Sequence, residues 1–133
     1  MITLEIRKYL GIPFENHGDT FDGVDCYGLA VLFNRHELAK ELPSYKKLYA
    51  NSRDHDQAAG AFEVGRQDWA IVNDAPKFGD LILYKERGAV THCGIYLDGR
   101  DFLHIREGST SVIEPLNSVH WASRQENIIR WIS

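Results

Sequence analysis

The sequence has few of the features that mark several large classes of protein. Its 133 residues include two cysteines, one methionine and four prolines, with no internal repeat, low-complexity run or block of like charges. The longest apolar run is Leu29–Phe33, whereas a membrane-spanning helix needs about 20 apolar residues in succession. These absences argue against a repeat architecture, a disordered chain and a membrane partner.

The charge and composition favour a globular domain that does not bind nucleic acid. The net charge is -4 and the isoelectric point is near 5.8, whereas nucleic-acid-binding proteins usually carry a basic face. Apolar residues make up 44% of the chain and charged residues 26%, which is usual for globular proteins. At this length we expect one domain spanning residues 1–133.

The N-terminal residues 1–14 do not resemble a secretory leader. They lack a basic region followed by an apolar stretch and a small-residue cleavage site, so we expect synthesis in the cytoplasm without a signal peptide. In such a chain the two cysteines, Cys26 and Cys93, are expected to be free thiols rather than a disulfide.

The expected helices precede the expected strands along the chain. Helices are predicted at residues 2–10, from Cys26 to Leu42 and, less regularly, after Asp54 or Asp56. Short apolar or alternating runs predict strands at residues 80–84, 91–97, 101–105, 111–116 and 127–132. This order predicts an α+β domain with an antiparallel sheet.

Cys26 stands where a polar loop becomes the second predicted helix, with Asp25 as the expected N-cap. The free N–H groups and the dipole of a helix N-terminus stabilise a thiolate, and they can also hold an oxyanion during acyl transfer. The alternative is a small core residue that packs beside Leu29 and Phe33. Position alone leaves both interpretations open.

A cysteine nucleophile needs a base, usually a histidine that a third polar group orients. Of the six histidines, His92 and His104 lie on the two strands of one predicted hairpin, so they are candidates for the base and its orienting residue. His17, in the loop before Cys26, is expected to line a cleft.

The hairpin register tests this pairing, because side chains alternate between the faces of a strand. A strict two-residue turn would put His92 and His104 on opposite faces. A three-residue connection, Asp98–Arg100, with a left-handed residue at its second or third position, puts both on one face. Cys93 would then point to the opposite, packed face as a structural thiol.

A zinc site built from Cys26, His92, Cys93 and His104 is the rival for the same residues. His92 and Cys93 are adjacent on a predicted strand and therefore face opposite ways, and the chain has no Cys-x-x-Cys pair. We therefore expect no metal and no other cofactor.

Four segments resemble the NlpC-type cysteine peptidases in the order in which that family has them. "GVDCYGL" resembles the family's Asp-Cys-Ser-Gly signature, and "FGDLILY" the strand before its histidine. "THCGIYLDG" is similar to the segment that carries the histidine, and "DFLHI" to the strand with the third polar residue. The run over residues 9–45 is similar to the branch found in phage tail assembly or tail-tip proteins.

The resemblance implies a papain-like α+β fold that hydrolyses peptidoglycan stem peptides between D-glutamate and a diamino acid. By motif position, Cys26 would be the nucleophile, His92 the base and His104 the orienting residue, and Asp25 would bind the free amine of a trimmed stem peptide. The implied partners are stem peptides and phage tail proteins, and the implied location is a virion tail.

Two positions depart from the usual family pattern. Tyr27 replaces the serine after the cysteine, as in the phage-type branch, and is expected to contact substrate together with His17. Phe14 replaces a tyrosine whose hydroxyl assists at the oxyanion site, so that contact would have to come from His17 or Tyr27.

Two other functions remain open. The chain could be a phage tail assembly protein with little hydrolase activity, or it could act on lipid acyl donors. The sequence has no long apolar face that favours the lipid substrate. Residues 44–75 are expected to form part of the specificity wall.

Overall fold

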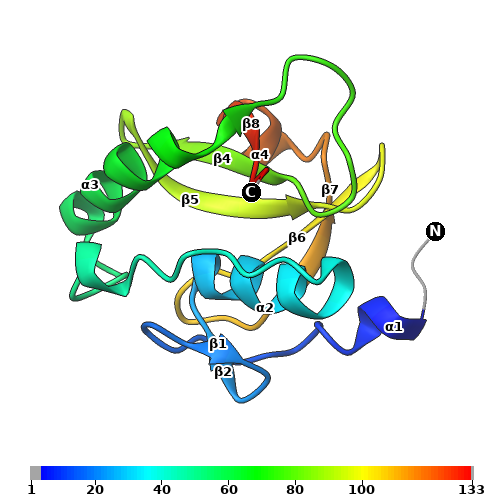
Figure 1. Ribbon diagram of the computed structural model, residues 1–133, viewed down its shortest axis with the longest axis horizontal. Coiled ribbons are helices and arrows are strands. Elements are labelled where there is room, and N and C mark those ends of the chain that lie inside the picture. Colours follow the sequence, from blue (N-terminus) through cyan, green and yellow to red (C-terminus); the bar gives the residue numbers. More distant parts are fainter. Residues whose placement is uncertain (1–3, 133) are drawn as a thin grey trace.

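A computed structural model describes residues 4–132, in which helices and loops cover one face of an antiparallel sheet (Figure 1). The helical elements are α1 Leu4–Arg7, α2 Cys26–Leu38, η1 Lys46–Leu48, α3 His55–Gly65, η2 Arg66–Asp68 and α4 Val119–Ala122. The strands are β1 Asp19–Thr20, β2 Gly23–Val24, β3 Ala70–Ile71, β4 Leu81–Glu86, β5 Ala89–Tyr96, β6 Asp101–His104, β7 Val112–Pro115 and β8 Gln125–Arg130. The α+β prediction is therefore confirmed.

The main sheet has six strands in the order β3-β8-β4-β5-β6-β7, and every neighbouring pair is antiparallel. All five strands predicted from the sequence are present in it, while β3 is an additional short edge strand. The predicted first helix is shorter than expected: α1 ends at Arg7, and the expected start at residue 2 lies outside the described residues.

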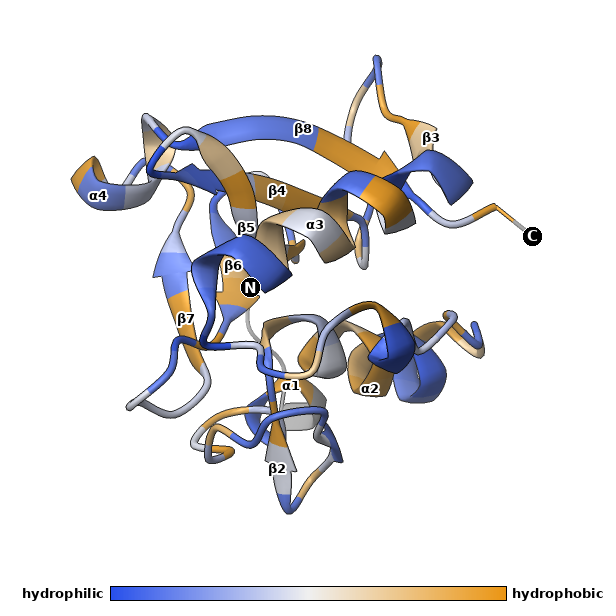
Figure 2. Cartoon of the chain, turned by 90° about the vertical axis from the view of Figure 1, so that its left-hand side faces the viewer, coloured by the Kyte–Doolittle hydropathy of each residue, from blue (hydrophilic) through white to orange (hydrophobic). Residues whose placement is uncertain are grey.

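Both faces of β4 are buried from Leu81 to Tyr84, which explains why these residues form an uninterrupted apolar run. Leu81 and Leu83 belong to the larger core, which includes the buried residues of α2, whereas Ile82 and Tyr84 pack with Trp121 of α4 on the other face. Figure 2 shows that both β4 and α2 contain apolar stretches and that the two elements lie in different layers. No helix within residues 4–132 combines the length and apolar character needed to cross a membrane.

Helix α2 begins at Cys26, as predicted, with Asp25 as its N-cap. It ends at Leu38 rather than Leu42, because Ala39 adopts a left-handed conformation with φ 52° and its N–H bonds back to the Asn34 carbonyl. This earlier end lets the following chain turn back over the core, where Leu42 is buried.

The β5–β6 hairpin has the predicted register. Ile95 pairs with Leu103 and the Leu97 N–H donates to the Asp101 carbonyl at 3.1 Å, which leaves a three-residue connection. The left-handed residue expected in this connection is absent. Instead, Asp98 Oδ1 accepts hydrogen bonds from the N–H groups of Arg100 and Asp101 and so closes the turn.

Candidate active site

Cys26 is the first residue of α2 and its side chain is half-buried. The preceding loop approaches the helix so closely that a Cβ at position 28 would lie 1.7 Å from the Gly18 carbonyl oxygen. Gly28 is therefore required for the loop to reach the helix N-terminus. This is the structural reason for a glycine two residues after the cysteine.

Beneath the nucleophile candidate lies the second cysteine. Cys93 is fully buried in the core that faces α2, and its Sγ donates to the Cys26 carbonyl at 3.5 Å. Its contact with Cys26, and then its burial, hold the pKa of the Cys93 thiol well above its usual value. The prediction that Cys93 is a packed structural thiol is confirmed.

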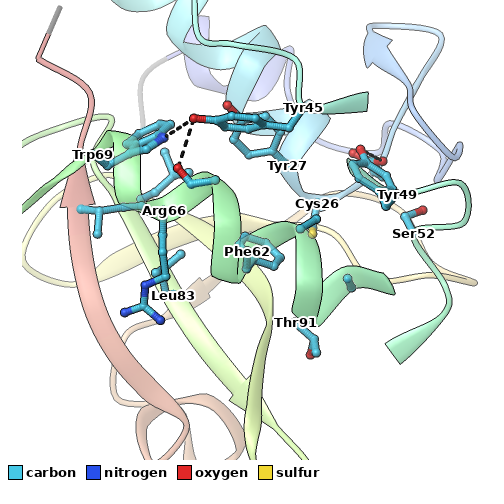
Figure 3. Close-up of a pocket in the computed structure, with 16 residues that line it drawn as sticks. Cys26, Tyr27, Tyr45, Tyr49, Ser52, Phe62, Arg66, Trp69, Leu83 and Thr91 are labelled. Atoms are coloured by element: carbon cyan, nitrogen blue, oxygen red, sulfur yellow. Dashed lines mark hydrogen bonds between the residues drawn. The ribbon is translucent and has the colours of Figure 1, made fainter. Parts of the chain in front are cut away.

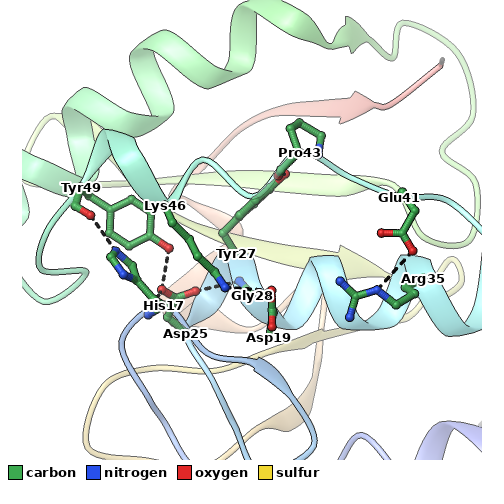
Figure 4. A network of polar contacts seen from close by, with 10 residues as sticks. All are labelled: His17, Asp19, Asp25, Tyr27, Gly28, Arg35, Glu41, Pro43, Lys46 and Tyr49. Atoms are coloured by element: carbon green, nitrogen blue, oxygen red, sulfur yellow. Dashed lines mark hydrogen bonds and ion pairs between the residues drawn. The ribbon is translucent and has the colours of Figure 1, made fainter.

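The carboxylate of Asp25 ties three segments together at this helix end (Figure 4). Oδ1 accepts from the Gly28 N–H at 2.7 Å, and Oδ2 accepts from the His17 N–H at 3.0 Å and the Tyr49 hydroxyl at 2.7 Å. The residue is only 2% exposed. Asp25 therefore fixes the position of Cys26, while the predicted role in binding an amine stays a prediction.

His17 and Tyr49 complete this support. The His17 backbone is left-handed with φ 64°, and its Nε2–H donates to the Tyr49 carbonyl at 2.7 Å. Neither of the two cavities beside Cys26 has His17 in its lining. The geometry gives His17 a part in holding the loop, and its predicted contact with substrate stays a prediction.

His92, His104 and Glu114 form a hydrogen-bonded chain across β5, β6 and β7. His92 Nε2 lies 2.8 Å from His104 Nδ1, and His104 Nε2 lies 2.5 Å from Glu114 Oε2. The two imidazoles are 4% and 1% exposed, and Trp121 of α4 stacks on His92 at a centroid distance of 4.8 Å.

The carboxylate at one end of this chain sets the tautomer of both rings. Because Glu114 only accepts hydrogen bonds, His104 carries its proton on Nε2 and offers a bare Nδ1 to His92. His92 then donates from Nε2 and has its lone pair on Nδ1. The arrangement leaves His92 Nδ1 available as a base.

The imidazoles are held neutral by their surroundings. Burial, followed by the charges of His104, Arg106 and His120, keeps the pKa of His92 well below its usual value. Burial also lowers the pKa of His104, although the hydrogen bond and charge of Glu114 oppose this shift. An imidazole must be unprotonated to accept a proton, and the lowered pKa of His92 favours this neutral form.

Cys26 and His92 open on the same polar cavity, which has a volume of about 360 Å³. A bulge at the His92 end of β5, where Tyr84 pairs with His92 but Lys85 pairs with Val90, interrupts the regular ladder beside the cavity. Within residues 4–132, Cys26 and His92 are not hydrogen-bonded to each other. Such contacts are often long before substrate binds.

Comparison with known proteins identifies the family of this chain. The model of the NlpC/P60 family matches residues 11–130. The chain belongs to the NlpC/P60 family. The family prediction is therefore confirmed, whereas no comparison tests the phage tail branch.

Two Escherichia coli K12 proteins are among the similar sequences. The murein DD-endopeptidase MepS/murein LD-carboxypeptidase is 25% identical over 129 residues, covering 97% of this chain and 61% of the relative. The probable endopeptidase NlpC is 27% identical over 119 residues, covering 88% of this chain and 68% of the relative. The chain thus spans less than two thirds of MepS.

Solved structures show the same fold. An NlpC/P60 family protein from Bacillus cereus ATCC 10987 matches 94% of this chain and 37% of its own with a TM-score of 0.67 and 21% identity. The NlpC/p60 domain of the peptidoglycan hydrolase SagA matches 93% of this chain and 91% of its own with a TM-score of 0.60 and 18% identity. The fold is the papain-like one predicted.

A second, apolar cavity adjoins Cys26 in this NlpC/P60 fold (Figure 3). Rings from α2, from α3, from the segment between them and from the residue that follows η2 line it, among them Tyr27, Tyr45, Tyr49, Phe62 and Trp69. The predicted site residue Tyr27 is one of these lining residues. Its hydroxyl donates to the Pro43 carbonyl at 2.6 Å, and burial raises the pKa of its phenol. Several residues between positions 45 and 69 therefore line one side of this cavity, while the expected role of residues 44–75 in specificity stays a prediction.

Phe14 lies at the polar cavity, where the guanidinium of Arg53 stacks 5.0 Å from its ring centre. The ring cannot donate a hydrogen bond, so the oxyanion contact missing from the sequence is also missing here. Ser52 lines both cavities, and its Oγ is a buried oxygen without a hydrogen-bond partner in the described chain.

Sequence reasoning missed Glu114. The β6–β7 register pairs Phe102 with Glu114, which puts the carboxylate on the face of His104. This register could not be predicted from the sequence, because residues 105–111 form a connection between β6 and β7 that is too long for turn geometry to determine which residues pair. Within residues 4–132, no group of three or more histidine, cysteine or acidic side chains has a metal-binding arrangement.

Proposed function

We propose that the chain is a cysteine peptidase that hydrolyses peptidoglycan stem peptides. The observation that carries this proposal is that Cys26, at a helix N-terminus, opens on the same cavity as the end of the His92–His104–Glu114 chain. Membership of the NlpC/P60 family and the murein endopeptidase names of two relatives support it.

The reaction follows from the assigned tautomers. His92 Nδ1 takes the proton from the Cys26 thiol, and the thiolate attacks the scissile carbonyl carbon. Backbone N–H groups at the start of α2 stabilise the oxyanion. The C–N bond then breaks as His92 returns the proton to the leaving amine, and water, deprotonated by His92, hydrolyses the thioester to release the acid and restore the thiol.

Glu114 would be a positioning residue in this mechanism. His92 becomes a cation during each proton transfer. The carboxylate of Glu114 would stabilise this cation through the hydrogen bonds that join it to His104 and His104 to His92. Asp25 would hold the nucleophile in place, and Ser52 Oγ is the hydroxyl available to stand in for the tyrosine that Phe14 replaces.

The finer parts of the proposal rest on the sequence resemblance. These are cleavage between D-glutamate and a diamino acid, association with phage tail proteins and location in a virion tail. The apolar cavity beside Cys26 is small, about 50 Å³, and therefore suits a short aliphatic group such as an alanine side chain better than a lipid chain.

The reactivity of Cys26 tests whether this thiol is catalytic or only packed. At pH 6 we expect iodoacetamide to alkylate Cys26 at least about tenfold faster than glutathione, because an unprotonated His92 can accept the thiol proton as the sulfur attacks. Peptide mapping separates Cys26 from the buried Cys93. Alkylation slower than that of glutathione would favour the tail assembly function instead.

A further inference from the structure

The polar cavity that holds Cys26 and His92 has an unusually basic wall for an acidic protein. Four arginines line it but only two carboxylates: Arg53, Arg87, Arg106 and Arg124, with Glu86 and Glu107. The whole chain has a net charge of -4. The excess positive charge is therefore a property of the cavity and not of the surface as a whole.

Two of these arginines are matched by the two carboxylates. Arg106 lies 3.1 Å from Glu86, and Arg53 lies 3.4 Å from Glu107. The nearby Glu126 is also engaged, since it pairs with Arg66 at 2.8 Å and with Lys85 at 3.2 Å. Each of these three carboxylates is therefore already paired with a cation other than the remaining two arginines.

Arg87 and Arg124 have no carboxylate partner within residues 4–132. Arg87 is held in the β4–β5 turn by a left-handed backbone with φ 49°, and one nitrogen of Arg124 donates to the His120 carbonyl. The two segments adjoin, because the Lys85 N–H donates to the Arg124 carbonyl at 2.8 Å. Two guanidinium groups without a carboxylate partner in the described residues thus come from neighbouring backbone onto the wall of the cavity.

We propose that Arg87 and Arg124 form a subsite for a free carboxylate of the peptide that Cys26 attacks. This inference rests on the proposed function and names the chemistry that the site selects. A guanidinium group binds a carboxylate through two parallel hydrogen bonds and attracts it from a distance, whereas a carboxamide offers one acceptor and no charge. We assign this group to the α-carboxylate of the D-glutamate at the bond proposed above, so the subsite favours stem peptides in which that carboxylate is free over those in which it is amidated.

Two synthetic stem peptides that differ only in this group test the subsite. For the wild-type protein we expect kcat/KM to be at least about tenfold higher for the carboxylate than for the carboxamide, mainly through KM. Arg87→Gln and Arg124→Gln should each reduce this ratio, and the double variant should bring it close to one. Arg100→Gln, which removes a charge from the exposed β5–β6 turn, should leave the ratio unchanged.

Binding measured on the Cys26→Ala variant separates this inference from the proposed function. A Kd at least about tenfold lower for the carboxylate peptide, and lost in the arginine double variant, would support the subsite even without turnover. Equal Kd values, or tighter binding of the carboxamide, would overturn the subsite and leave the hydrolase proposal standing. Binding of glycerol phosphate polymers in preference to both peptides would also overturn it.

Discussion

Replacing His92 with alanine is expected to lower kcat/KM for muropeptide hydrolysis by at least about 10³-fold. His92 is the one histidine that shares the cavity of Cys26 and also has its Nε2 fixed by a second histidine. Without it, the thiol has no base, and the leaving amine has no acid to protonate it. Release of peptide fragments, followed by liquid chromatography, measures the loss.

His36→Ala is the matched control, because His36 packs against Phe21 at a centroid distance of 5.3 Å and does not line the polar cavity. We expect this variant to keep most of the wild-type rate. If His92→Ala retained more than about a tenth of the activity while folded, another group would be the base and the mechanism proposed for Cys26 would be wrong.

Replacing Glu114 with glutamine is expected to lower kcat by about 10- to 100-fold with little change in KM. A glutamine amide can donate to His104 Nε2, which allows the tautomer in which His104 donates to His92. His92 would then carry its proton on Nδ1 and could no longer accept one from Cys26. Loss of the negative charge also destabilises the protonated form of His92, so the acid limb of the kcat/KM profile should move to lower pH.

The readout that separates this role from simple packing is the protonation of the rings. Nitrogen-15 chemical shifts should place the His92 proton on Nε2 in the wild-type protein and show a mixture of tautomers in Glu114→Gln. Glu41→Gln, at an exposed ion pair with Arg35, should change neither shifts nor rate. Unchanged His92 shifts together with unchanged kcat in Glu114→Gln would remove Glu114 from the mechanism.

Local sequence rules predicted much of the fold because its decisive features are local. The N-cap at Asp25 and the buried run of β4 each depend on a few adjacent residues. The requirement that His92 and His104 share a face also predicted a three-residue connection between β5 and β6, and the structure has this connection. The register of one short turn was thus enough to bring two candidate residues together.

The remaining features depend on contacts between distant segments. The Tyr49 hydroxyl meets Asp25 across 24 residues of sequence, and this contact, with the cap to Gly28, occupies a carboxylate that the resemblance assigned to an amine. Glu114 reaches His104 only through the register of a long connection. The sequence predicts that α2 ends at Leu42, just before a proline, whereas Ala39 ends the helix earlier through a left-handed conformation.

Digestion of muropeptides with defined stem composition, by the wild-type protein and by Cys26→Ala, tests the central claim most directly. Mass spectrometry of the products identifies the bond that is cleaved. We expect the wild-type protein to cleave an amide of the stem peptide and Cys26→Ala to cleave none. Cleavage by both proteins, or by neither across several wall chemotypes while both remain folded, would contradict it.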